Sequence, residues 1–471
     1  MRILLAAVNS QFVHSSPALY ALRRAAEAAG LGHDPRLELL NAEYSITMSN
    51  LRIMEEIYRQ RPDVLAFSVY IWNIAPLRDL ICDLRLLLPE TTILLGGPEA
   101  SGRAADYLRE LPVDGIFIGE GEDSFPAYLQ ALSRGEQRPH IPGLLWKGQE
   151  QEYQPAPRPD FTAQPFLYLP EDIRELGERH KIVYYESSRG CPFSCAFCGS
   201  AAEPLRERPL ELVLPELEQL AQTGGQVKFI DRTFNAKTER ACIITKKLLE
   251  LYRPGLSWHC EISPFHLPQP LVELWLQAPA DYLKLEMGVQ SLYPPALAAI
   301  GRHGDWRQAE PTVKRLIAAG NCHLHLDLIA GLPEDTPQGF ADSFHRLHQL
   351  DADYLQFGFL KVLPGSLLAA TAKERGLVFE EQAPYRILST PTMDGDYLFR
   401  LGRAERMFNS LYNKSKLDFR KRLIAAAQLW PGGAMGLYMR AAQLWDGVTG
   451  LNQQDKLALV ARLEAEAGIR G

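Results

Sequence analysis

Three cysteines fall within eight residues of this chain, in the segment Ser188-Arg-Gly-Cys191-Pro-Phe-Ser-Cys195-Ala-Phe-Cys198-Gly. Thiolates with the spacing C-x3-C-x2-C can curl around one soft metal centre. If the centre is a cube of four irons, three protein ligands leave one iron free to bind another molecule. A fourth protein ligand would close the site and make it structural. The triplet therefore predicts a catalytic iron–sulfur cluster at Cys191, Cys195 and Cys198.

A zinc site is the alternative, with a fourth ligand such as His259, Cys260 or His303. Zinc ligands usually come as two separated pairs, and this triplet has no second pair. The chain has seven cysteines in all. An odd number without an export signal does not indicate a disulfide framework.

The form C-x3-C-x-aromatic-C resembles the signature of the radical S-adenosylmethionine (SAM) superfamily, over about residues 180 to 370. Three further segments resemble the coproporphyrinogen dehydrogenase branch. They are Cys260-Glu261-Ile-Ser-Pro, Gly288-Val-Gln290-Ser with Arg302 twelve residues on, and Leu326-Asp327-Leu-Ile-Ala-Gly-Leu-Pro. The resemblance implies that the free iron of a [4Fe–4S] cluster binds SAM, which is then cleaved reductively to a 5′-deoxyadenosyl radical.

The same resemblance implies a set of SAM contacts. Phe197 would pack beside the adenine, while Glu261, Gln290, Arg302 and Asp327 would contact the methionine and ribose parts. Asp231, at the end of a predicted strand, is a further candidate. Carboxylates can bind an ammonium group or ribose hydroxyls, and a guanidinium can bind a carboxylate. The alternative for these residues is a polar network inside a barrel.

His323 and His325 alternate with Leu324 and Leu326, so they share one strand face with Asp327. We interpret them as core or interface histidines in preference to groups that bind substrate or transfer protons.

Alternating strand and helix patterns must position these residues. Six strands are predicted after the first third of the chain, at 182–188, 227–231, 257–262, 282–288, 323–330 and 354–360. Helical patterns separate them, and eight such units would be needed for a complete barrel. Residues 176–371 are therefore predicted to form a partial (β/α)6 barrel, with the cysteine triplet on the loop after its first strand.

Residues 1–135 show the same alternation, with strands predicted at 3–8, 37–41, 64–70, 92–96 and 115–118. Short apolar strands between helices indicate an α/β, doubly wound, Rossmann-like domain. Residues 136–175 are rich in proline and are predicted to be a linker. Residues 372–471 are mostly helical in pattern and are predicted to form a helical C-terminal domain.

Loops at the strand ends of the first domain carry the residues that would bind its ligand. The candidates are Asn9, His14, Ser68, Gly96, Gly97, Glu99, Gly119, Glu120 and Gly121. The Gly-Gly-Pro-Glu and Gly-Glu-Gly-Glu segments, ahead of a radical barrel, resemble the cobalamin-binding domain of cobalamin-dependent radical enzymes. The D-x-H-x-x-G motif that supplies an axial histidine elsewhere in that superfamily is missing, so no histidine is expected on cobalt. A domain that kept the fold and lost the ligand is the alternative.

Overall charge limits the partners. A net charge of −7 and a pI near 5.9 argue against a general electrostatic grip on nucleic acid or an anionic membrane. No apolar run approaches the ~20 residues that span a bilayer. The opening residues are interpreted as a first strand, so a cytoplasmic location is expected. A locally basic, aromatic stretch between residues 399 and 422 is interpreted as a helix with a solvated face and core aromatics.

The leading hypothesis is a cobalamin-dependent radical SAM enzyme that methylates an unactivated carbon of a small molecule. An external electron donor such as a flavodoxin or ferredoxin is expected. Cyclisation or rearrangement with cobalamin is the close rival. A tRNA methylthiotransferase needs three more cluster cysteines in its N-terminal domain, where this chain has only Cys82. A non-catalytic regulatory protein that binds metal or cobalamin is the third hypothesis.

Overall fold

The computed structural model describes residues 1–201, 203–414, 417–445 and 450–469. Two compact units are present. The first comprises residues 1–189, 206–230 and 253–256, and the second comprises residues 190–205, 231–252 and 257–471. Over the described ranges, the helices are all too short or too polar to cross a membrane.

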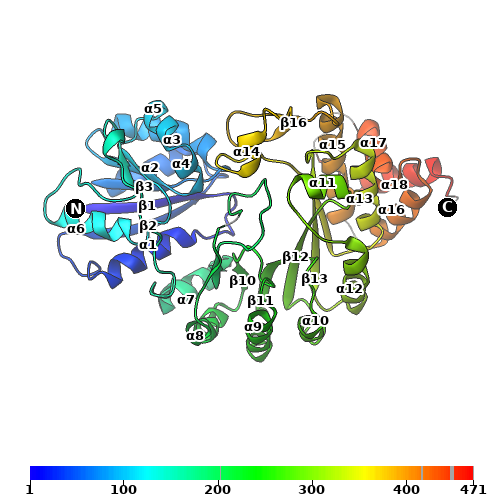
Figure 1. Ribbon diagram of the computed structural model, residues 1–471, viewed down its shortest axis with the longest axis horizontal. Helices are drawn as coiled ribbons and strands as arrows, with labels where there is room; N and C mark the ends of the chain where they lie inside the picture. Colours follow the sequence, from blue (N-terminus) through cyan, green and yellow to red (C-terminus); the bar gives the residue numbers. More distant parts are fainter. Residues whose placement is uncertain (202, 415–416, 446–449, 470–471) are drawn as a thin grey trace. The chain divides into compact units, whose positions relative to one another are not determined.

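The first unit contains a six-stranded sheet in the order β2-β1-β3-β4-β5-β6 (Figure 1). Its strands are β1 (Arg2–Asn9), β2 (Glu38–Ser45), β3 (Val64–Ser68), β4 (Thr92–Gly96), β5 (Gly115–Phe117) and β6 (Leu144–Trp146). The pairings among β1 to β5 are parallel. The order reverses direction between β1 and β3, which is the switch point where doubly wound sheets bind ligands. The predicted Rossmann-like fold is confirmed.

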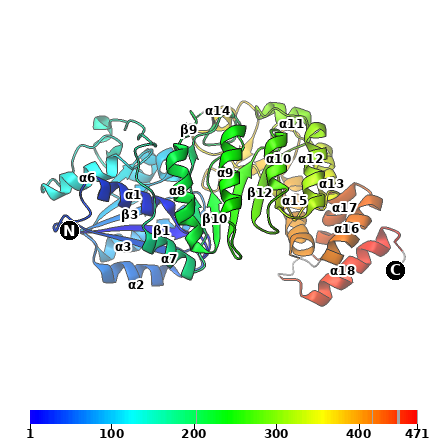
Figure 2. The ribbon, with the colours of Figure 1, turned by 90° about the horizontal axis from the view of Figure 1, so that it is seen from below.

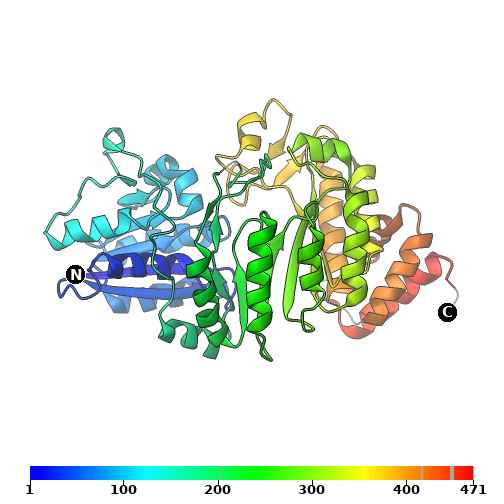
Figure 3. The ribbon, with the colours of Figure 1, turned by 60° about the horizontal axis from the view of Figure 1, so that its bottom comes forward.

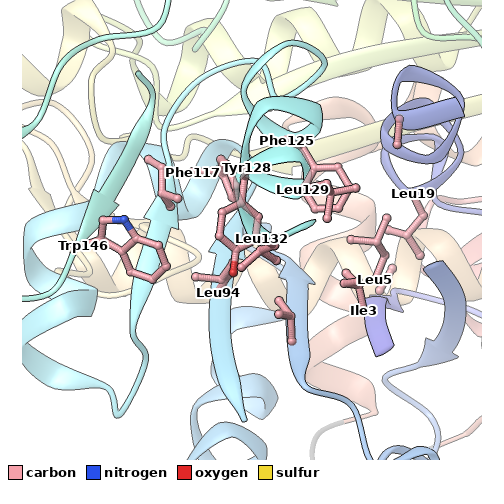
Figure 4. Close-up of a cluster of buried hydrophobic side chains, with 14 residues drawn as sticks. Ile3, Leu5, Leu19, Leu94, Phe117, Phe125, Tyr128, Leu129, Leu132 and Trp146 are labelled. Carbon is pink, nitrogen blue, oxygen red and sulfur yellow. The ribbon is translucent and has the colours of Figure 1, made fainter. Parts of the chain in front are cut away.

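Helices separate these strands. They are α1 (Pro17–Ala28), α2 (Asn50–Gln60), α3 (Ile74–Leu87), α4 (Pro98–Gly102), α5 (Ala104–Glu110) and α6 (Ser124–Ser133). They leave β1 buried on both faces, since residues 3–8 are each no more than 2% exposed. Ile3 and Leu5 pack in one cluster with Leu94, Phe125 and Tyr128 (Figure 4). Burial on both faces explains why these strands are uninterrupted apolar runs.

The segment predicted as a linker contains more structure than its sequence indicates. Its residues 144–146 form β6, which pairs antiparallel with β5. The Trp146 indole nitrogen donates to the carbonyl of Pro139 at 2.9 Å. Helix α7 (Pro170–Glu178) follows. Strand β6 has three residues and lies in a proline-rich stretch outside the strand–helix alternation, so the sequence pattern did not indicate it.

The second sheet also has six strands, in the order β14-β13-β12-β11-β10-β7. They are β7 (Val183–Tyr185), β10 (Gln226–Phe229), β11 (Ser257–Ile262), β12 (Leu283–Gln290), β13 (His323–Ala330) and β14 (Tyr354–Phe359). The pairings of β11 with β12, β12 with β13 and β13 with β14 are parallel. Six strands confirm the predicted partial barrel.

Helices cover one face of β11 to β14 (Figure 2). The helices that alternate with the strands of this sheet are α8 (Leu210–Leu220), α9 (Thr238–Glu250), α10 (Gln269–Trp275), α11 (Pro294–Ala299), α12 (Trp306–Ala319) and α13 (Pro337–His348). On β12 and β13 every second residue is buried and apolar, whereas the residues between are partly exposed. We call the face that carries those partly exposed residues the inner face. The alternation arises because only one face of these strands packs on helices.

Two short strands flank the cysteines in sequence. They are β8 (Ser188–Arg189) and β9 (Arg206–Glu207), which pair antiparallel. Residues 190–205 therefore form a loop whose two ends are tied together by backbone pairing.

The C-terminal region is helical, with one exception. After α14 (Leu367–Thr371), the strands β15 (Val378–Phe379) and β16 (Ile387–Ser389) form an antiparallel pair that the sequence pattern did not indicate. The helical elements that follow are α15 (Gly395–Phe408), η3 (Asn409–Asn413), α16 (Leu417–Leu429), α17 (Gly433–Leu444) and α18 (Gln453–Glu466), coloured orange to red in Figure 3. Phe408, Tyr412 and Phe419 are buried, as expected for core aromatics, whereas Phe399 is 60% exposed and does not meet that expectation. Residues 415 and 416 of the basic stretch lie outside the described residues.

Candidate functional site

The cysteine triplet is held by backbone contacts within its own loop and with residue 300. Cys195 is buried, whereas Cys191 and Cys198 are half-buried. The amide of Cys198 donates to the carbonyl of Cys195 at 3.0 Å, and the amide of Ala196 donates to the carbonyl of Ile300 at 2.9 Å. These bonds fix the loop so that its thiols share one neighbourhood.

The thiols influence one another. Burial raises the pKa of the Cys198 thiol, and the nearby thiols of Cys195 and Cys191 raise it further, against a hydrogen bond from the amide of Ser200. That amide lies 3.4 Å from the Cys198 sulfur, and the Thr233 hydroxyl lies 3.7 Å from the Cys191 sulfur. Amide and hydroxyl donors of this kind stabilise thiolate and sulfide in iron–sulfur sites. The donor set therefore fits a cluster held by three thiolates.

The residues considered as a fourth zinc ligand point elsewhere. His259 pairs with Glu286 at 2.7 Å. Cys260 is 2% exposed and shares the buried face of β11 with Trp258 and Ile262. His303 is exposed. Of these three residues, His259 and Cys260 are therefore held in other contacts, and His303 is exposed to solvent.

Arg302 lies beside the cysteines. Its Nη1 is 3.6 Å from the Cys195 sulfur, and its Nη2 donates to the carbonyl of Gly288. A bulge in β12 between Gly288 and Gln290 brings Gln290 to the same place, with a φ of +71°. A Cβ on Gly288 would lie 2.4 Å from the side-chain Nε2 of Gln290, so the Gln290 side chain packs directly against this glycine. The structure thus brings together Cys195, Arg302 and Gln290, which the sequence had placed at SAM.

The predicted carboxylates lie on or just after strands of the second sheet. Glu261 and Asp327 occupy the inner face of β11 and β13. Asp231 is 2% exposed and follows β10 directly. The amide of Phe234 donates to the carbonyl of Glu261 at 2.8 Å, which ties the segment after Asp231 to β11. Phe197 is half-buried between Cys195 and Cys198.

The inner face holds two histidine–carboxylate pairs that the sequence analysis did not place at the site. His259 Nε2 lies 2.7 Å from Glu286 Oε2, and His325 Nε2 lies 3.0 Å from Asp327 Oδ1. The signal that could have found them is the period-two alternation of polar residues along β12 and β13. His325, interpreted as a core histidine, is therefore part of a polar cluster on a partly exposed face.

The ligand edge of the first sheet begins with Asn9 and His14. The Asn9 amide donates to the carbonyl of His14 at 3.0 Å and to Glu43 at 2.7 Å. His14 Nδ1 lies 2.6 Å from the Tyr184 hydroxyl. Burial lowers the pKa of His14, and the charges of Lys228 and Lys181 lower it further. His14 therefore has a structural partner for one ring nitrogen, and its imidazole is held neutral.

Gly96, Gly97, Ser68 and Glu99 shape the next loop. Gly97 has a φ of +103°, and a Cβ there would lie 2.6 Å from the carbonyl oxygen of Val69. No other residue fits this position without moving backbone. Ser68 and Glu99 are buried, and the Tyr107 hydroxyl donates to Glu99. Glu99 is therefore engaged within the domain.

Exposed aromatic residues surround this edge, and the sequence analysis did not single them out. Phe12 is 57% exposed and Trp72 is 47% exposed. Trp72 stacks on Tyr70 at 4.2 Å, and Lys181 lies 4.3 Å from the centre of the Phe12 ring. Phe12 follows β1 and Trp72 follows β3, on the two sides of the switch point. Flat apolar groups here can cover a large planar ligand.

The acidic loop after β5 contacts two arginines. Gly119 has a φ of +88° and Gly121 lies close to Leu22. Glu120 pairs with Arg206 and, at 2.6 Å, with Arg189, which also pairs with Glu122 at 2.9 Å. Arg189 and Arg206 are in β8 and β9, the two strands that flank the cysteine loop in sequence. We call Glu120, Glu122, Arg189 and Arg206 the loop brace.

Comparison with known protein families identifies two domains in this chain. Residues 3–129 match the model of the B12 binding domain, and residues 185–347 match that of the Radical SAM superfamily. The chain therefore carries both domains.

Several curated relatives are methyltransferases or methylases by name, and others are methylthiotransferases. An uncharacterised methyltransferase of Pyrococcus horikoshii is 28% identical over 59% of this chain and 62% of its own length. The cobalamin-dependent radical SAM methyltransferase TokK of Streptomyces tokunonensis is 29% identical over 66% of this chain and 49% of its own. The hopanoid C-3 methylase of Methylococcus capsulatus is 30% identical over 45% of this chain and 44% of its own length. The chain thus spans less than two thirds of each of these relatives.

Two solved structures share the fold along the whole chain. TsrM, a radical SAM methyltransferase from Kitasatospora setae, matches with a TM-score of 0.63 at 16% identity, over 99% of both chains. The cobalamin-dependent SAM radical enzyme OxsB matches with a TM-score of 0.61 at 15% identity, over 99% of this chain and 71% of that one. At these identities the likeness establishes the fold.

Proposed function

We propose that this chain, in which a B12 binding domain precedes a radical SAM domain, is a cobalamin-dependent radical SAM enzyme that methylates an unactivated carbon of a small molecule. Residues 1–135 form the cobalamin-binding domain in this proposal, 136–175 the connection, 176–371 the radical barrel and 372–471 a helical domain. The single observation that carries it is Arg302, which lies against Cys195 and the bulge at Gln290.

The neighbours support both cofactors. TsrM was solved with cobalamin and a [4Fe-4S] cluster, and OxsB with aqua-cobalamin and SAM. TsrM was also solved with its substrate tryptophan and a SAM analogue, which supports a small-molecule substrate here. The methyltransferase names of the curated relatives support methyl transfer over cyclisation or rearrangement.

In this proposal, residues of the second sheet and its loops would hold the cluster and SAM. Cys191, Cys195 and Cys198 would hold a [4Fe–4S] cluster, whose electron cleaves the sulfonium of SAM. Arg302 would bind the carboxylate of SAM, because a guanidinium pairs well with that group. Glu261 and Asp327 would bind its ammonium group or ribose hydroxyls, while Phe197, Asp231 and Gln290 would orient it. An external flavodoxin or ferredoxin would supply the electron.

In the first domain, the strand-end loops would bind cobalamin. Asn9, Ser68, Gly96, Gly97 and Glu99 line the edge where the sheet order reverses, and Gly119, Glu120 and Gly121 follow β5. Phe12 and Trp72 would lie against the corrin ring. Cobalamin would supply the methyl group for transfer. His14 would keep the contact of its Nδ1 with the Tyr184 hydroxyl.

Anaerobic reconstitution with iron, sulfide and hydroxocobalamin tests the proposal. About four irons per chain and one cobalamin are expected, with reductant-dependent formation of 5′-deoxyadenosine from SAM. The triple variant Cys191→Ala/Cys195→Ala/Cys198→Ala should lose the iron and keep the cobalamin. Cys82→Ala, at an exposed position on α3, is the matched control and should keep both.

Two outcomes would contradict the proposal. Iron without cobalamin would leave a radical enzyme without the proposed methyl donor. A fully loaded protein that makes no 5′-deoxyadenosine would favour a regulatory protein.

A further inference from the structure

The two short strands at the ends of the cysteine loop place like charges opposite each other. Strands β8 and β9 pair antiparallel, and their register puts Arg189 directly opposite Arg206. Like charges in directly opposed positions destabilise a strand pair. The Glu120 carboxylate contacts both guanidinium groups. Its Oε2 lies 2.6 Å from Arg189 Nη1 and 3.1 Å from Arg206 Nη1, and its Oε1 accepts from Arg206 Nη2. The pairing of β8 with β9 is therefore stabilised by a carboxylate that neither strand supplies.

Further contacts hold the two arginines in place. Arg189 also pairs with Glu122 at 2.9 Å and with Glu186 at 2.7 Å. Arg206 Nη1 also donates to the carbonyl of Pro159 at 3.1 Å. The side chains of the loop brace are only 11% to 24% exposed, and all four residues belong to the first unit. A sheltered network of several charges is held more firmly than a single exposed ion pair.

The cysteine loop, residues 190–205, begins and ends at these two strands. Its ends lie close together, because a Cβ on Gly190 would lie 2.4 Å from the carbonyl oxygen of Pro204. The amide of Cys191 donates to the carbonyl of Glu203 at 3.2 Å. Cys191 follows the end of β8 by two residues. The strand pair therefore helps to fix the first cysteine of the triplet.

The loop that carries Glu120 lies at the ligand edge of the first sheet, after β5. Its Gly119 has a φ of +88°, and a Cβ on this residue would meet nothing within 4 Å, so the backbone here is open to a ligand. Both oxygens of the Glu120 carboxylate accept from arginines, so the loop offers a ligand its backbone and not its charge. A ligand that orders Gly119 and Gly121 thereby also orders Glu120, which lies between them.

We propose that the loop brace couples the two cofactor sites of this chain, so that occupation of either site strengthens binding at the other. Residues 190–205 become fixed when the three thiolates hold a cluster, and β8 and β9 transmit that order to both arginines and to Glu120. The loop after β5 is then already ordered, and the protein loses less conformational entropy when cobalamin binds. The effect is reciprocal, because one coupling free energy applies to both ligands. This inference rests on the proposed function, which assigns the two cofactors to these loops.

The affinity of the full chain for hydroxocobalamin tests the coupling. Anaerobic equilibrium dialysis, with cobalt measured by mass spectrometry, gives the Kd of the cluster-free chain and of the chain reconstituted with iron and sulfide. Iron analysis confirms that the second sample carries its cluster. In the wild type the cluster should lower the Kd at least about five-fold. An equal Kd in the two states would overturn the proposal.

Arginine variants show whether the loop brace carries the coupling. Arg206→Gln removes one partner of Glu120 and should reduce the effect of the cluster on the Kd to less than about two-fold. Arg189→Gln should do the same, and it replaces Arg206→Gln if that variant fails to fold or to hold iron. Arg134→Gln is the matched control and should keep the full effect, because Arg134 pairs with Glu136 at an exposed position of the same unit. If both brace variants keep the full effect, even with weaker cobalamin binding overall, the loop brace is only structural and the proposal is overturned.

Iron retention gives a second measurement and separates this inference from the proposed function. Saturating hydroxocobalamin should slow the transfer of iron from the wild-type holoenzyme to a chelator, and it should leave the rate in Arg206→Gln unchanged. A chain that binds both cofactors with unlinked affinities keeps the proposed function and loses this inference. A chain that binds iron but no cobalamin loses both.

Discussion

In the first sheet, β1 buries both of its faces, whereas β12 and β13 in the second sheet bury only every other residue. The apolar side chains of β1 meet helices on either side, so its strand positions contribute to stability alone. The candidate ligand contacts of the first sheet lie at the last residues of its strands and in the loops that follow. On β12 and β13 most residues of the inner face are polar.

The difference teaches where function can be altered without unfolding the protein. In a sheet covered on both sides, a binding residue can be placed only where a strand ends. In a sheet covered on one side, alternate strand positions are released from packing and can bind a ligand directly. In the function we propose, the first sheet would therefore bind its ligand at an edge, and the second would bind its ligand across a face.

Adjacent residues of β1 provide the strongest test. Leu4→Ala and Leu5→Ala should each lower the free energy of unfolding by about 2–5 kcal/mol, because both side chains are buried, on opposite faces. Urea unfolding followed by circular dichroism measures the loss. Leu51→Ala, at a position 69% exposed on α2, is the control and should change stability by less than about 0.5 kcal/mol. If only one of the two substitutions lowered the free energy of unfolding, β1 would not be packed on both faces and would not differ from β12 and β13.

Adjacent residues of β13 should give unequal results. Leu326→Ala should again cost about 2–5 kcal/mol, since Leu326 is 0% exposed. His325→Ala should change stability by no more than about 1 kcal/mol, because its ion pair is partly exposed and its ring is not in the apolar core. The same urea experiment compares them. Equal losses at the two positions would mean that the inner face is structural.

The alternation along the strands also decided what could be predicted. The bounds of β11 and β13 were predicted to the residue, because a period of two is visible over six to eight residues. Strand β6 and the pair β15–β16 have only two or three residues each, and they lie outside the strand–helix alternation that predicted the equally short β5 and β7. Their formation depends on neighbouring strands.

The same limit applies to the site. The three cysteines lie within one loop, so their spacing alone indicated a shared centre. Arg302 was found through a motif resemblance, and its position beside Cys195 came only with the structure. The pair His259–Glu286 joins residues 27 apart, and Glu120–Arg189 joins residues 69 apart. Such pairs depend on strand register and loop path, which a sequence does not show.

The loop brace tests whether the charged residues at the edge of the first sheet stabilise the fold. Its expected effect on the free energy of unfolding is the smallest. Glu120→Gln should lower stability by about 1–2 kcal/mol at pH 7, because Arg189 and Arg206 lose a partly buried carboxylate. The holoenzyme should also release iron faster, because the loop brace holds the two strands that flank the cysteine loop in sequence. Glu136→Gln is the control, because Glu136 and its partner Arg134 are both well exposed.

The pH dependence of that effect follows from the pKa of Glu120. Burial alone would raise this pKa, but hydrogen bonds and ion pairs with Arg206 and Arg189 outweigh burial and lower it below the ordinary 4.5. A carboxyl whose pKa is lowered by folding adds stability that is complete above its ordinary pKa and is lost as the pH falls through the lowered value. The stability gap between wild type and Glu120→Gln should therefore stay constant from about pH 8 to pH 5. Urea midpoints of the apo-protein across that range measure it. A gap that closes between pH 7 and pH 5 would show that Glu120 takes up a proton there, and the edge of the first sheet would then carry a titrating group where we infer a fixed ion pair.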